Sequence, residues 1–250
     1  MSRVVFIIDK LDKQTQSMVL QNMKDLAKFY ANPLTIKFLD TRYQSDYLHL
    51  YETEKNFVQA ISNEAELRSL YINQYFVSQD KGNVNGYTNE FVNNRKLDTL
   101  PKNKRQQVLM KQNDDVVVAV NYDATGKLIK SVDFANPGQK NPSKRALVNR
   151  VGNIQIIRYF DELTKKPLQD DYVDTQLNPF MRVGFDEKGL RASYEFLNFD
   201  TPPVRSELDL YEQWFKQEIA TDDIIVNYHR DFDIIFESFN NQENIYLVSL

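Results

Sequence analysis

The sequence contains no cysteine, which excludes disulfide bonds, thiolate zinc sites and thiol catalysis. Glycine is scarce as well: 7 glycines in 250 residues leave little material for the glycine-rich loops that bind nucleotide phosphates. There are two histidines, His49 and His229, and no Walker, Gly-x-Gly-x-x-Gly or Gly-x-Ser-x-Gly motif. The usual catalytic motifs are therefore missing.

Long apolar runs are absent too. The run Val4–Ile8 is closed by Asp9 and Lys10, so it is too short for a signal sequence. No stretch reaches the roughly 18 apolar residues of a membrane span. We therefore expect a cytoplasmic protein with no transmembrane segment.

The charge balance argues against polyanionic partners. A net charge of −4 and a pI near 5.4 repel nucleic acid and anionic membranes, unless a local basic patch overcomes the average. The short run Lys102, Lys104 and Arg105 is interpreted as a solvated loop. We expect no nucleic-acid partner.

The first elements that the sequence predicts alternate between strand and helix. The run Val4–Ile8 is typical of a strand buried on both faces, residues 13–30 have helical spacing, and Leu34–Leu39 predicts a second strand. This βαβ unit opens a Rossmann-like domain. The segment Tyr43–Val77 is interpreted as one or two helices, and residues 82–94 as a loop or a short helix.

Beyond Val108 the hydrophobic period changes to that of strands. Residues 116–122 and 128–134 predict a hairpin, and residues 154–160, 181–185 and 190–199 predict further strands. An aromatic residue followed by Asp recurs at the turns, as Tyr122-Asp123, Phe160-Asp161 and Phe185-Asp186. In such turns Asp accepts backbone N–H groups, and the glycine that follows two of them takes a positive φ. The repeat predicts an antiparallel meander of six or more strands.

The α/β pattern then returns, with a helix after Thr201-Pro202-Pro203 and strands at residues 224–226 and 245–248. Fifty residues could not bury a core alone, so the last segment should complete the first domain. The predicted organisation is a Rossmann-like domain formed by residues 1–104 and 201–250. A large antiparallel β insertion, residues 105–200, interrupts it.

Candidate binding residues follow two strands of the predicted parallel sheet. Lys10 and Lys13 follow the first strand and could contact an anion, although a solvated lysine is the commoner case at such a position. After strand 224–227, His229 could act as a base or hydroxyl partner, Arg230 could hold an anion or a carboxylate, and Asp231 or Asp233 could orient sugar hydroxyls. A structural salt-bridged turn explains this second group equally well. His49 is interpreted as a core or interface histidine, and we identify no metal site and no cofactor.

The segments Asn121–Gly126, Arg158–Asp161, Gly184–Gly189 and Asp223–Arg230 together resemble the N-terminal half of bacterial GT-B glycosyltransferases. The resemblance is to wall teichoic acid α-glycosyltransferases and to the accessory-secretion glycosyltransferases that modify serine-rich adhesins. It extends over residues 105–250 and more loosely over the opening βαβ unit. It implies an acceptor-side Rossmann-like domain whose β insertion serves oligomer contacts or acceptor binding, with a nucleotide sugar as donor substrate.

Two departures from that family bear on activity. The glycine-containing loop after the first strand is replaced by Asp9-Lys10-Leu11-Asp12, and the chain ends at Leu250, where such enzymes continue into a donor-binding domain with a paired-glutamate motif. We expect no catalysis by this chain alone. Two functions stay open: the acceptor-binding half of a transferase, completed by a C-terminal domain or partner enzyme, and a non-catalytic accessory subunit that binds a glycan or protein acceptor. A homo- or hetero-oligomer through the β insertion fits either.

Overall fold

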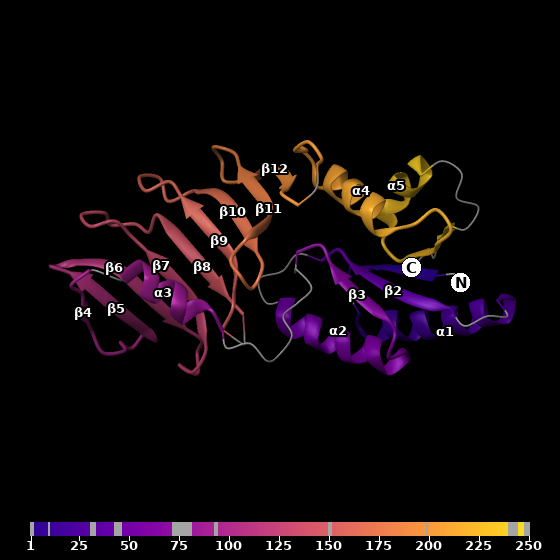
Figure 1. The fold of residues 1–250 in the computed structure, drawn as a ribbon, viewed down its shortest axis with the longest axis horizontal. Coiled ribbons are helices and arrows are strands. Elements are labelled where there is room, and N and C mark those ends of the chain that lie inside the picture. The colour runs from indigo at the N-terminus through magenta and orange to yellow at the C-terminus, as the bar shows by residue number, and fades with distance from the viewer. Residues whose placement is uncertain are drawn as a thin grey trace. The chain divides into compact units, whose positions relative to one another are not determined.

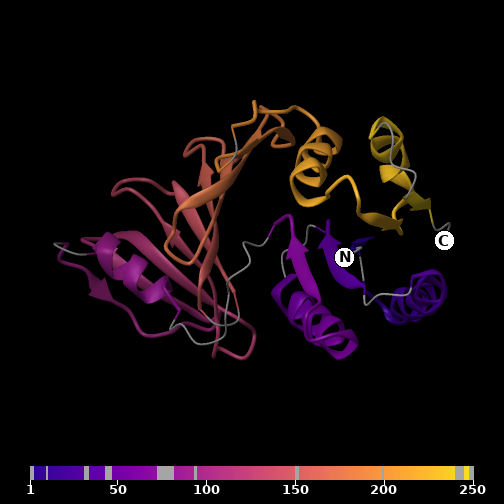
Figure 2. The ribbon, with the colours of Figure 1, turned by 45° about the vertical axis from the view of Figure 1, so that its right-hand side comes forward.

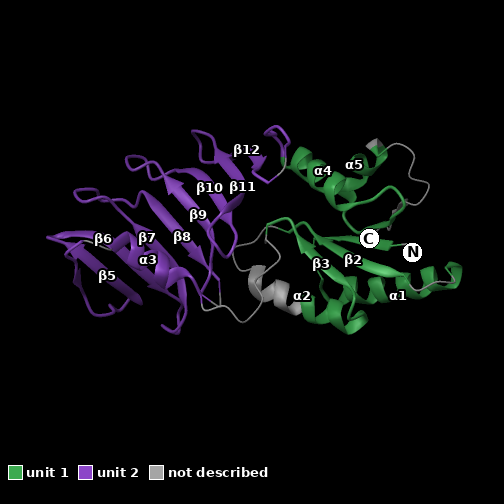
Figure 3. Cartoon of the chain, viewed as in Figure 1, with its two compact units in different colours: residues 1–74, 207–250 green, residues 75–206 purple. Residues whose placement is uncertain are grey.

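The computed structural model describes residues 3–9, 11–30, 34–42, 47–71, 82–92, 95–149, 152–198, 200–239 and 245–247; side chains are described for all of these except 47–53, 238 and 245–247. The chain divides into two compact units: residues 1–74 with 207–250 (unit 1) and residues 75–206 (unit 2) (Figure 3). From the sequence we placed these boundaries after residues 104 and 200. The observed first boundary comes earlier than the expected one because residues 84–99 pack with the antiparallel sheet of unit 2.

Unit 1 is built on a parallel sheet whose described strands have the order β14-β13-β1-β2-β3. The central strand β1 pairs with β13 from Val4↔Ile224 to Ile7↔Asn227, and with β2 from Arg3↔Thr35 to Ile8↔Asp40. The first and last segments of the chain therefore share one sheet, as expected. Its elements are β1 (Arg3–Ile8), α1 (Lys13–Phe29), β2 (Thr35–Asp40), α2 (Tyr47–Ile61), β3 (Glu66–Ser69), α4 (Glu207–Glu218), β13 (Ile224–Asn227), η1 (Arg230–Phe232), α5 (Asp233–Ser238) and β14 (Ile245–Leu247).

Helices cover both faces of this sheet. Helices α1 and α2 lie on one face, and α4 and α5 lie on the other (Figure 1 and Figure 2). On the first face Phe6 stacks on Phe38 with ring centroids 5.1 Å apart, and Val19 of α1 is fully buried. On the other face the last turn of α4 is fixed by cations, since the Glu218 carbonyl accepts hydrogen bonds from Arg3 and Lys37. A strand run covered on both sides explains why Val4–Ile8 carries no polar residue.

One element of unit 1 contradicts the sequence prediction. Residues 66–69, within the segment interpreted as one or two helices, form β3 and pair in parallel with β2 from Lys37↔Glu66 to Asp40↔Ser69. The outer edge of β2 has backbone donors and acceptors to satisfy, and β3 satisfies them. A four-residue segment with Leu67 as its one apolar residue shows no period that distinguishes strand from helix, so the tertiary context decides.

The two points at which the chain leaves and re-enters unit 1 are joined by a hydrogen bond. Tyr71 follows β3 and is buried, and its hydroxyl donates to Glu207 Oε1 at 2.6 Å, at the start of α4. Burial raises the pKa of Tyr71, and the neighbouring Tyr211 and Glu207 raise it further. The phenol therefore stays protonated and keeps its role as donor.

Unit 2 is a meander in which every described strand pairs antiparallel with the next, in the order β12-β11-β10-β9-β8-β7-β6-β5-β4. Helix α3 packs on one face, where Tyr87 and Phe91 contact Phe134 edge to face at 5.5 and 4.6 Å (Figure 1). The elements are α3 (Val84–Val92), β4 (Asp98–Thr99), β5 (Gln107–Gln112), β6 (Asp115–Tyr122), β7 (Ile129–Phe134), β8 (Lys144–Val148), β9 (Ile154–Phe160), β10 (Pro167–Val173), β11 (Pro179–Phe185) and β12 (Arg191–Phe196).

The aromatic-Asp turns form as predicted. Asp123 accepts hydrogen bonds from the backbone N–H groups of Lys127 and Leu128, and Gly126 has φ of 70°. Asp161 and Asp186 accept backbone N–H groups in the same way, and Gly189 has φ of 80°. The hydrogen bond from the Thr125 hydroxyl, with those from the backbone, lowers the pKa of Asp123, and the hydrogen bonds from the Thr164 N–H and hydroxyl lower that of Asp161. A fourth turn, in which Asp174 accepts from two backbone N–H groups, was not predicted because Val173 precedes it instead of an aromatic residue.

A row of charged residues crosses the strands of unit 2. Arg145 and Arg158 are directly opposite on β8 and β9, where two guanidinium groups would repel each other. Each is paired on its other side: Arg145 with Asp133 at 2.5 Å, and Arg158 with Asp170 at 2.7 and 2.6 Å. The row is therefore neutral, with its acids outside and its bases in the middle.

The two acids of this row should differ in their contribution to stability. The Asp170 side chain is fully buried, whereas that of Asp133 is 18% exposed beside a more accessible arginine. We expect Asp170→Ala to lower the free energy of unfolding by about 2–4 kcal/mol, because it removes the carboxylate that forms two short hydrogen bonds with the mostly buried Arg158 guanidinium. Asp133→Ala should cost about 1 kcal/mol or less. Chemical denaturation measures both, and equal losses would contradict the interpretation.

Candidate functional site

The carboxyl end of the parallel sheet in unit 1 brings together residues from three strands. Because β1, β2 and β13 run in the same direction, Asp9, Thr41 and His229 follow them at the same edge. The strand order also reverses here, since β2 and β3 lie on one side of β1 and β13 and β14 lie on the other. Open α/β sheets bind ligands at such a reversal.

His229 lies between two carboxylates at this edge. Its Nε2 is 3.9 Å from Asp9 Oδ2, its Nδ1 is 3.8 Å from Asp231 Oδ2, and its ring stacks on Phe232 with centroids 4.3 Å apart. Neither distance is that of a hydrogen bond. Nδ1 is buried without a hydrogen-bond partner among the described residues. The imidazole can therefore still form hydrogen bonds with a bound group, and a carboxylate lies beside each of its nitrogens.

Asn227 holds the turn that carries His229 and Asp233. Its Nδ2 donates to the His229 carbonyl and to Asp233 Oδ1, both at 2.8 Å, and its Oδ1 accepts from the His229 N–H at 3.0 Å. Asn227 is itself 2% exposed. The predicted residues His229 and Asp233 are thus brought together by a buried amide that the sequence analysis did not identify.

The predicted cations are placed less closely. Lys13 is the first residue of α1, is exposed, and forms no ion pair with another described residue, and Arg230 is exposed in η1. Lys10 lies outside the described residues. In the basic run of the sequence, Lys102 lies over the Tyr122 ring at 3.7 Å and donates to the Gly126 carbonyl, and Lys104 and Arg105 are exposed. His49 lies in α2, where its side chain is not among those described.

The N-terminus of α1 at this edge is already occupied. Asp12 is the N-cap, and its Oδ1 accepts from the Thr15 N–H at 3.0 Å and from the Thr15 hydroxyl at 3.1 Å. A carboxylate in this position takes the electrostatic role that a ligand phosphate takes in nucleotide-binding folds. Asp12 therefore places a carboxylate at the helix N-terminus, where nucleotide-binding folds place a ligand phosphate.

A second buried group lies beside Asp9 and was not predicted. Asp40 and Glu54 are 2% and 3% exposed, and Arg42 forms an ion pair with Glu54 and lies 3.7 Å from Asp40 Oδ2. Burial raises the pKa of Asp40 to about 6; Arg42 opposes this rise and Asp9 adds to it. The signal in the sequence was a polar Asp40-Thr41-Arg42 run directly after a buried strand.

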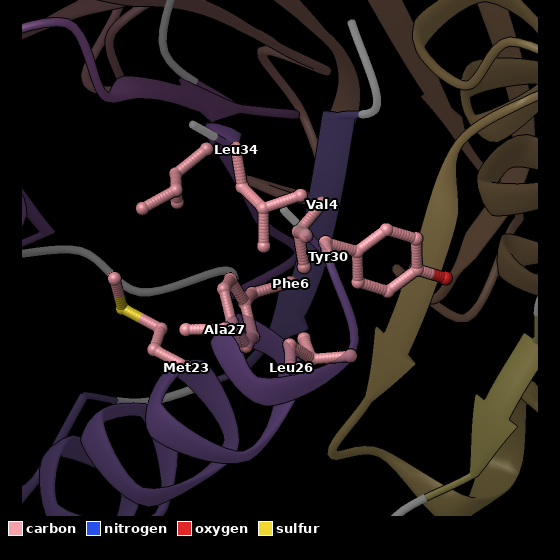
Figure 4. A pocket seen from close by; sticks show the side chains of 8 residues that line it. Val4, Phe6, Met23, Leu26, Ala27, Tyr30 and Leu34 are labelled. Carbon is pink, nitrogen blue, oxygen red and sulfur yellow. The ribbon is translucent and has the colours of Figure 1, made fainter. Parts of the chain in front are cut away.

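An apolar crevice of about 210 Å³ lies between α1 and strands β1 and β2 (Figure 4). No charged side chain lines it, so it offers no chemistry for catalysis. The lining residues are Val4, Phe6, Met23, Leu26, Ala27, Tyr30, Leu34 and Ile36. No group of three or more metal-ligating side chains converges anywhere in the described part of the chain, and none of its helices is long and apolar enough to cross a bilayer.

No protein-family model and no curated protein matches the sequence. Solved structures do match. A mutant of TarM from S. aureus has 13% identity and a TM-score of 0.69, over 99% of this chain and 50% of TarM. The pneumococcal O-GlcNAc transferase GtfA has 11% identity and a TM-score of 0.64, over 98% and 47%. The glycosylation-associated protein complex Gap123 from Streptococcus agalactiae has 12% identity and a TM-score of 0.57, over 98% and 51%.

These likenesses concern the fold. The chain spans about half the length of the structures it matches. They confirm the expected resemblance to the wall teichoic acid and adhesin glycosyltransferase kind, and the mixed α/β fold with a large antiparallel sheet.

The raised pKa of Asp40 predicts a pH-dependent stability. Because the folded-state pKa is above the unfolded value of about 3.9, the folded protein holds this proton more tightly, and the contribution is lost as pH rises through about 6. The free energy of unfolding of the wild type minus that of Asp40→Asn should therefore fall between pH 4 and 6.5. Asp161→Asn is the control, because the lowered pKa of Asp161 places its effect below this window. A flat difference for Asp40→Asn would sink the interpretation.

Proposed function

We propose that the chain is the acceptor-binding half of a glycosyltransferase that transfers a sugar from a nucleotide sugar to a cell-surface polymer or adhesin. In this proposal unit 1 is the Rossmann-like N-terminal domain of a GT-B enzyme, and unit 2 is its β insertion. The observation that carries it is a match over nearly the whole chain to only half of each glycosyltransferase structure. The strand order β3-β2-β1-β13-β14 supports it, since that order is typical of Rossmann folds.

The site at the carboxyl edge fits an acceptor with hydroxyl and anionic groups. His229, with Asp9 beside Nε2, would hold or deprotonate a hydroxyl group. Asp233 has one oxygen committed to Asn227 and would orient a second hydroxyl with the other. The exposed Arg230, with Lys13 and Lys10, would contact acceptor phosphate or carboxylate.

The donor is proposed to bind elsewhere, in a C-terminal domain or a partner transferase. Asp12 at the start of α1 supports this, since a sugar-nucleotide phosphate would meet a carboxylate there. The TarM mutant was solved with fondaparinux, alpha-GlcNAc-glycerol and UDP, and GtfA with UDP and GlcNAc. A uridine diphosphate sugar is therefore the donor class to test first.

The second candidate is a non-catalytic accessory subunit that binds the acceptor and docks on a partner transferase. It is favoured by matches to the Gap123 complex and to accessory secretory protein 1, 2 and 3 of Streptococcus pneumoniae, the latter at 11% identity and a TM-score of 0.53, over 98% of this chain and 61% of that one. In both candidates the protein acts in the cytoplasm, needs no metal or cofactor, and assembles through unit 2.

Calorimetric titration tests together the proposed acceptor site and the proposal that the donor binds elsewhere. We expect UDP-GlcNAc to give no heat with this chain alone, because Asp12 occupies the α1 N-terminus. Glycerol-phosphate oligomers or serine-rich peptides should bind. His229→Gln should weaken this binding about tenfold or more, the effect of losing one hydrogen bond to a charged or polar group.

Asp186→Asn, in a turn of unit 2, is the matched control and should bind the acceptor as the wild type does. Clear UDP-GlcNAc binding by this chain would contradict the separate donor site. Acceptor binding that is unchanged in His229→Gln would remove the proposed site.

The role of unit 2 in assembly is tested by its excision. The 2.6 Å hydrogen bond between Tyr71 and Glu207 joins the two parts of unit 1, so we replace residues 75–206 with a Gly/Ser linker. We expect the full chain to sediment as an oligomer and the excised protein as a folded monomer. An excised protein that keeps the oligomeric state would move the interface to unit 1.

A further inference from the structure

A buried amide stands beside apolar neighbours in the parallel sheet of unit 1. Asn227 pairs with Ile7 in the register of β13 and β1, and Ile7 pairs with Leu39 of β2, so the three side chains point to the same face of the sheet. Ile7 and Leu39 are fully buried, and Asn227 is 2% exposed. An apolar residue would fill this position without the cost of burying an amide, so core packing alone does not account for Asn227.

The hydrogen bonds of Asn227 show what the amide holds. Its Oδ1 accepts from the His229 N–H at 3.0 Å and its Nδ2 donates to the His229 carbonyl at 2.8 Å, so it pairs with both backbone groups of one residue. The second hydrogen of Nδ2 is donated to Asp233 Oδ1 at 2.8 Å. Reversing the amide would turn its oxygen toward a carbonyl and a carboxylate, so its orientation is fixed.

The residues that Asn227 holds lie where the chain leaves one regular element for the next. His229 has an extended backbone, with φ of −117°, between β13 and η1. Asp233 is the first residue of α5. The direction in which the His229 ring leaves the sheet, and the position of the Asp233 carboxylate beside it, therefore depend on the same amide.

We propose that Asn227 is the positioning residue of the acceptor site, and that it fixes His229 and Asp233 as one unit. This inference rests on the proposed function of that site. The amide is too buried to contact an acceptor, and both of its hydrogens are already donated within the protein. Its effect on acceptor binding must therefore pass through the two side chains that it holds.

A purely structural role would give a different result. An amide that only stabilised the fold would lower the free energy of unfolding when removed, and would leave the acceptor affinity of the folded protein unchanged. A positioning residue changes that affinity, and a substitution that keeps some of its hydrogen bonds restores part of the loss.

Acceptor titration of the full chain makes this distinction. The probe is whichever of glycerol-phosphate oligomers and serine-rich peptides the wild type binds. Asn227→Ala removes all three hydrogen bonds and should weaken binding about tenfold or more, as His229→Gln should. Asn227→Ser should weaken binding less, because its hydroxyl can still accept the His229 N–H, as serine does in turns.

Asn121→Ala is the matched control. The Asn121 amide of unit 2 also forms several hydrogen bonds, since its Nδ2 donates to the Ala119 carbonyl, Ser131 Oγ and Asp133 Oδ2 at 3.1 to 3.3 Å. Its loss should lower the free energy of unfolding and leave acceptor binding as in the wild type. Far-UV circular dichroism verifies that each variant is folded, and Asn227→Ser carries the test if Asn227→Ala is not.

NMR relaxation tests the positioning without any acceptor. The backbone order parameters of His229 and Asp233 should fall in Asn227→Ala from about 0.85, the value of rigid backbone, toward about 0.6. In Asn227→Ser the fall should be larger at Asp233 than at His229, because one hydroxyl hydrogen cannot replace both bonds of Nδ2. Asn121→Ala should leave both values unchanged.

Three results would overturn the proposal. The first is a folded Asn227→Ala that binds the acceptor as the wild type does while His229→Gln binds it more weakly. The second is an equal loss of affinity in Asn121→Ala, and the third is unchanged order at His229 and Asp233 in Asn227→Ala. A wild type that binds no acceptor would remove the proposed function instead, and the order parameters alone would then decide whether Asn227 fixes the two residues.

Discussion

The pairing of β1 with both β2 and β13 is the constraint on which the rest of the structure depends. A strand buried on both faces must satisfy its backbone groups along both edges, and β1 does so with one neighbour from residues 35–40 and another from residues 224–227. The first segment is therefore incomplete without the last. Whatever lies between them must leave unit 1 and return to it, and the hydrogen bond between Tyr71 and Glu207 joins the points of departure and return.

The same pairing creates the site. Parallel strands bring the residues that follow them to one edge, so Asp9 and His229, which are 220 positions apart in sequence, lie 3.9 Å apart in space. The sequence predicted this edge, because a buried apolar run followed by polar residues is a local pattern. It did not predict the Asp9–His229 pair or the contact of Arg42 with Glu54, because these depend on the spacing between strands and on the position of α2. The Asn227 amide was not identified either, although its hydrogen bonds with His229 and Asp233 are local.

The contrast between the turns of unit 2 and strand β3 of unit 1 makes the same point. The turns at Asp123, Asp161 and Asp186 were predictable because their hydrogen bonds join residues within five positions of one another. Strand β3 was not, since its four residues are a strand only because β2 has a free edge. The first boundary of unit 2 was misplaced by thirty residues for a related reason. Helix α3 is amphipathic in sequence, but which sheet receives its apolar face is decided by Phe134 and its neighbours.

The edges of the meander limit how unit 2 can meet other molecules. At one end β4 pairs with β5, and the N–H groups of Leu100 and Asn103 extend that cover by donating to the carbonyls of Leu109 and Gln107. At the other end Val204 and Tyr194 exchange two hydrogen bonds of 2.8 Å beside β12. Covered edges do not recruit a further strand. The proposed assembly through unit 2 should therefore use the faces or the turns of the sheet.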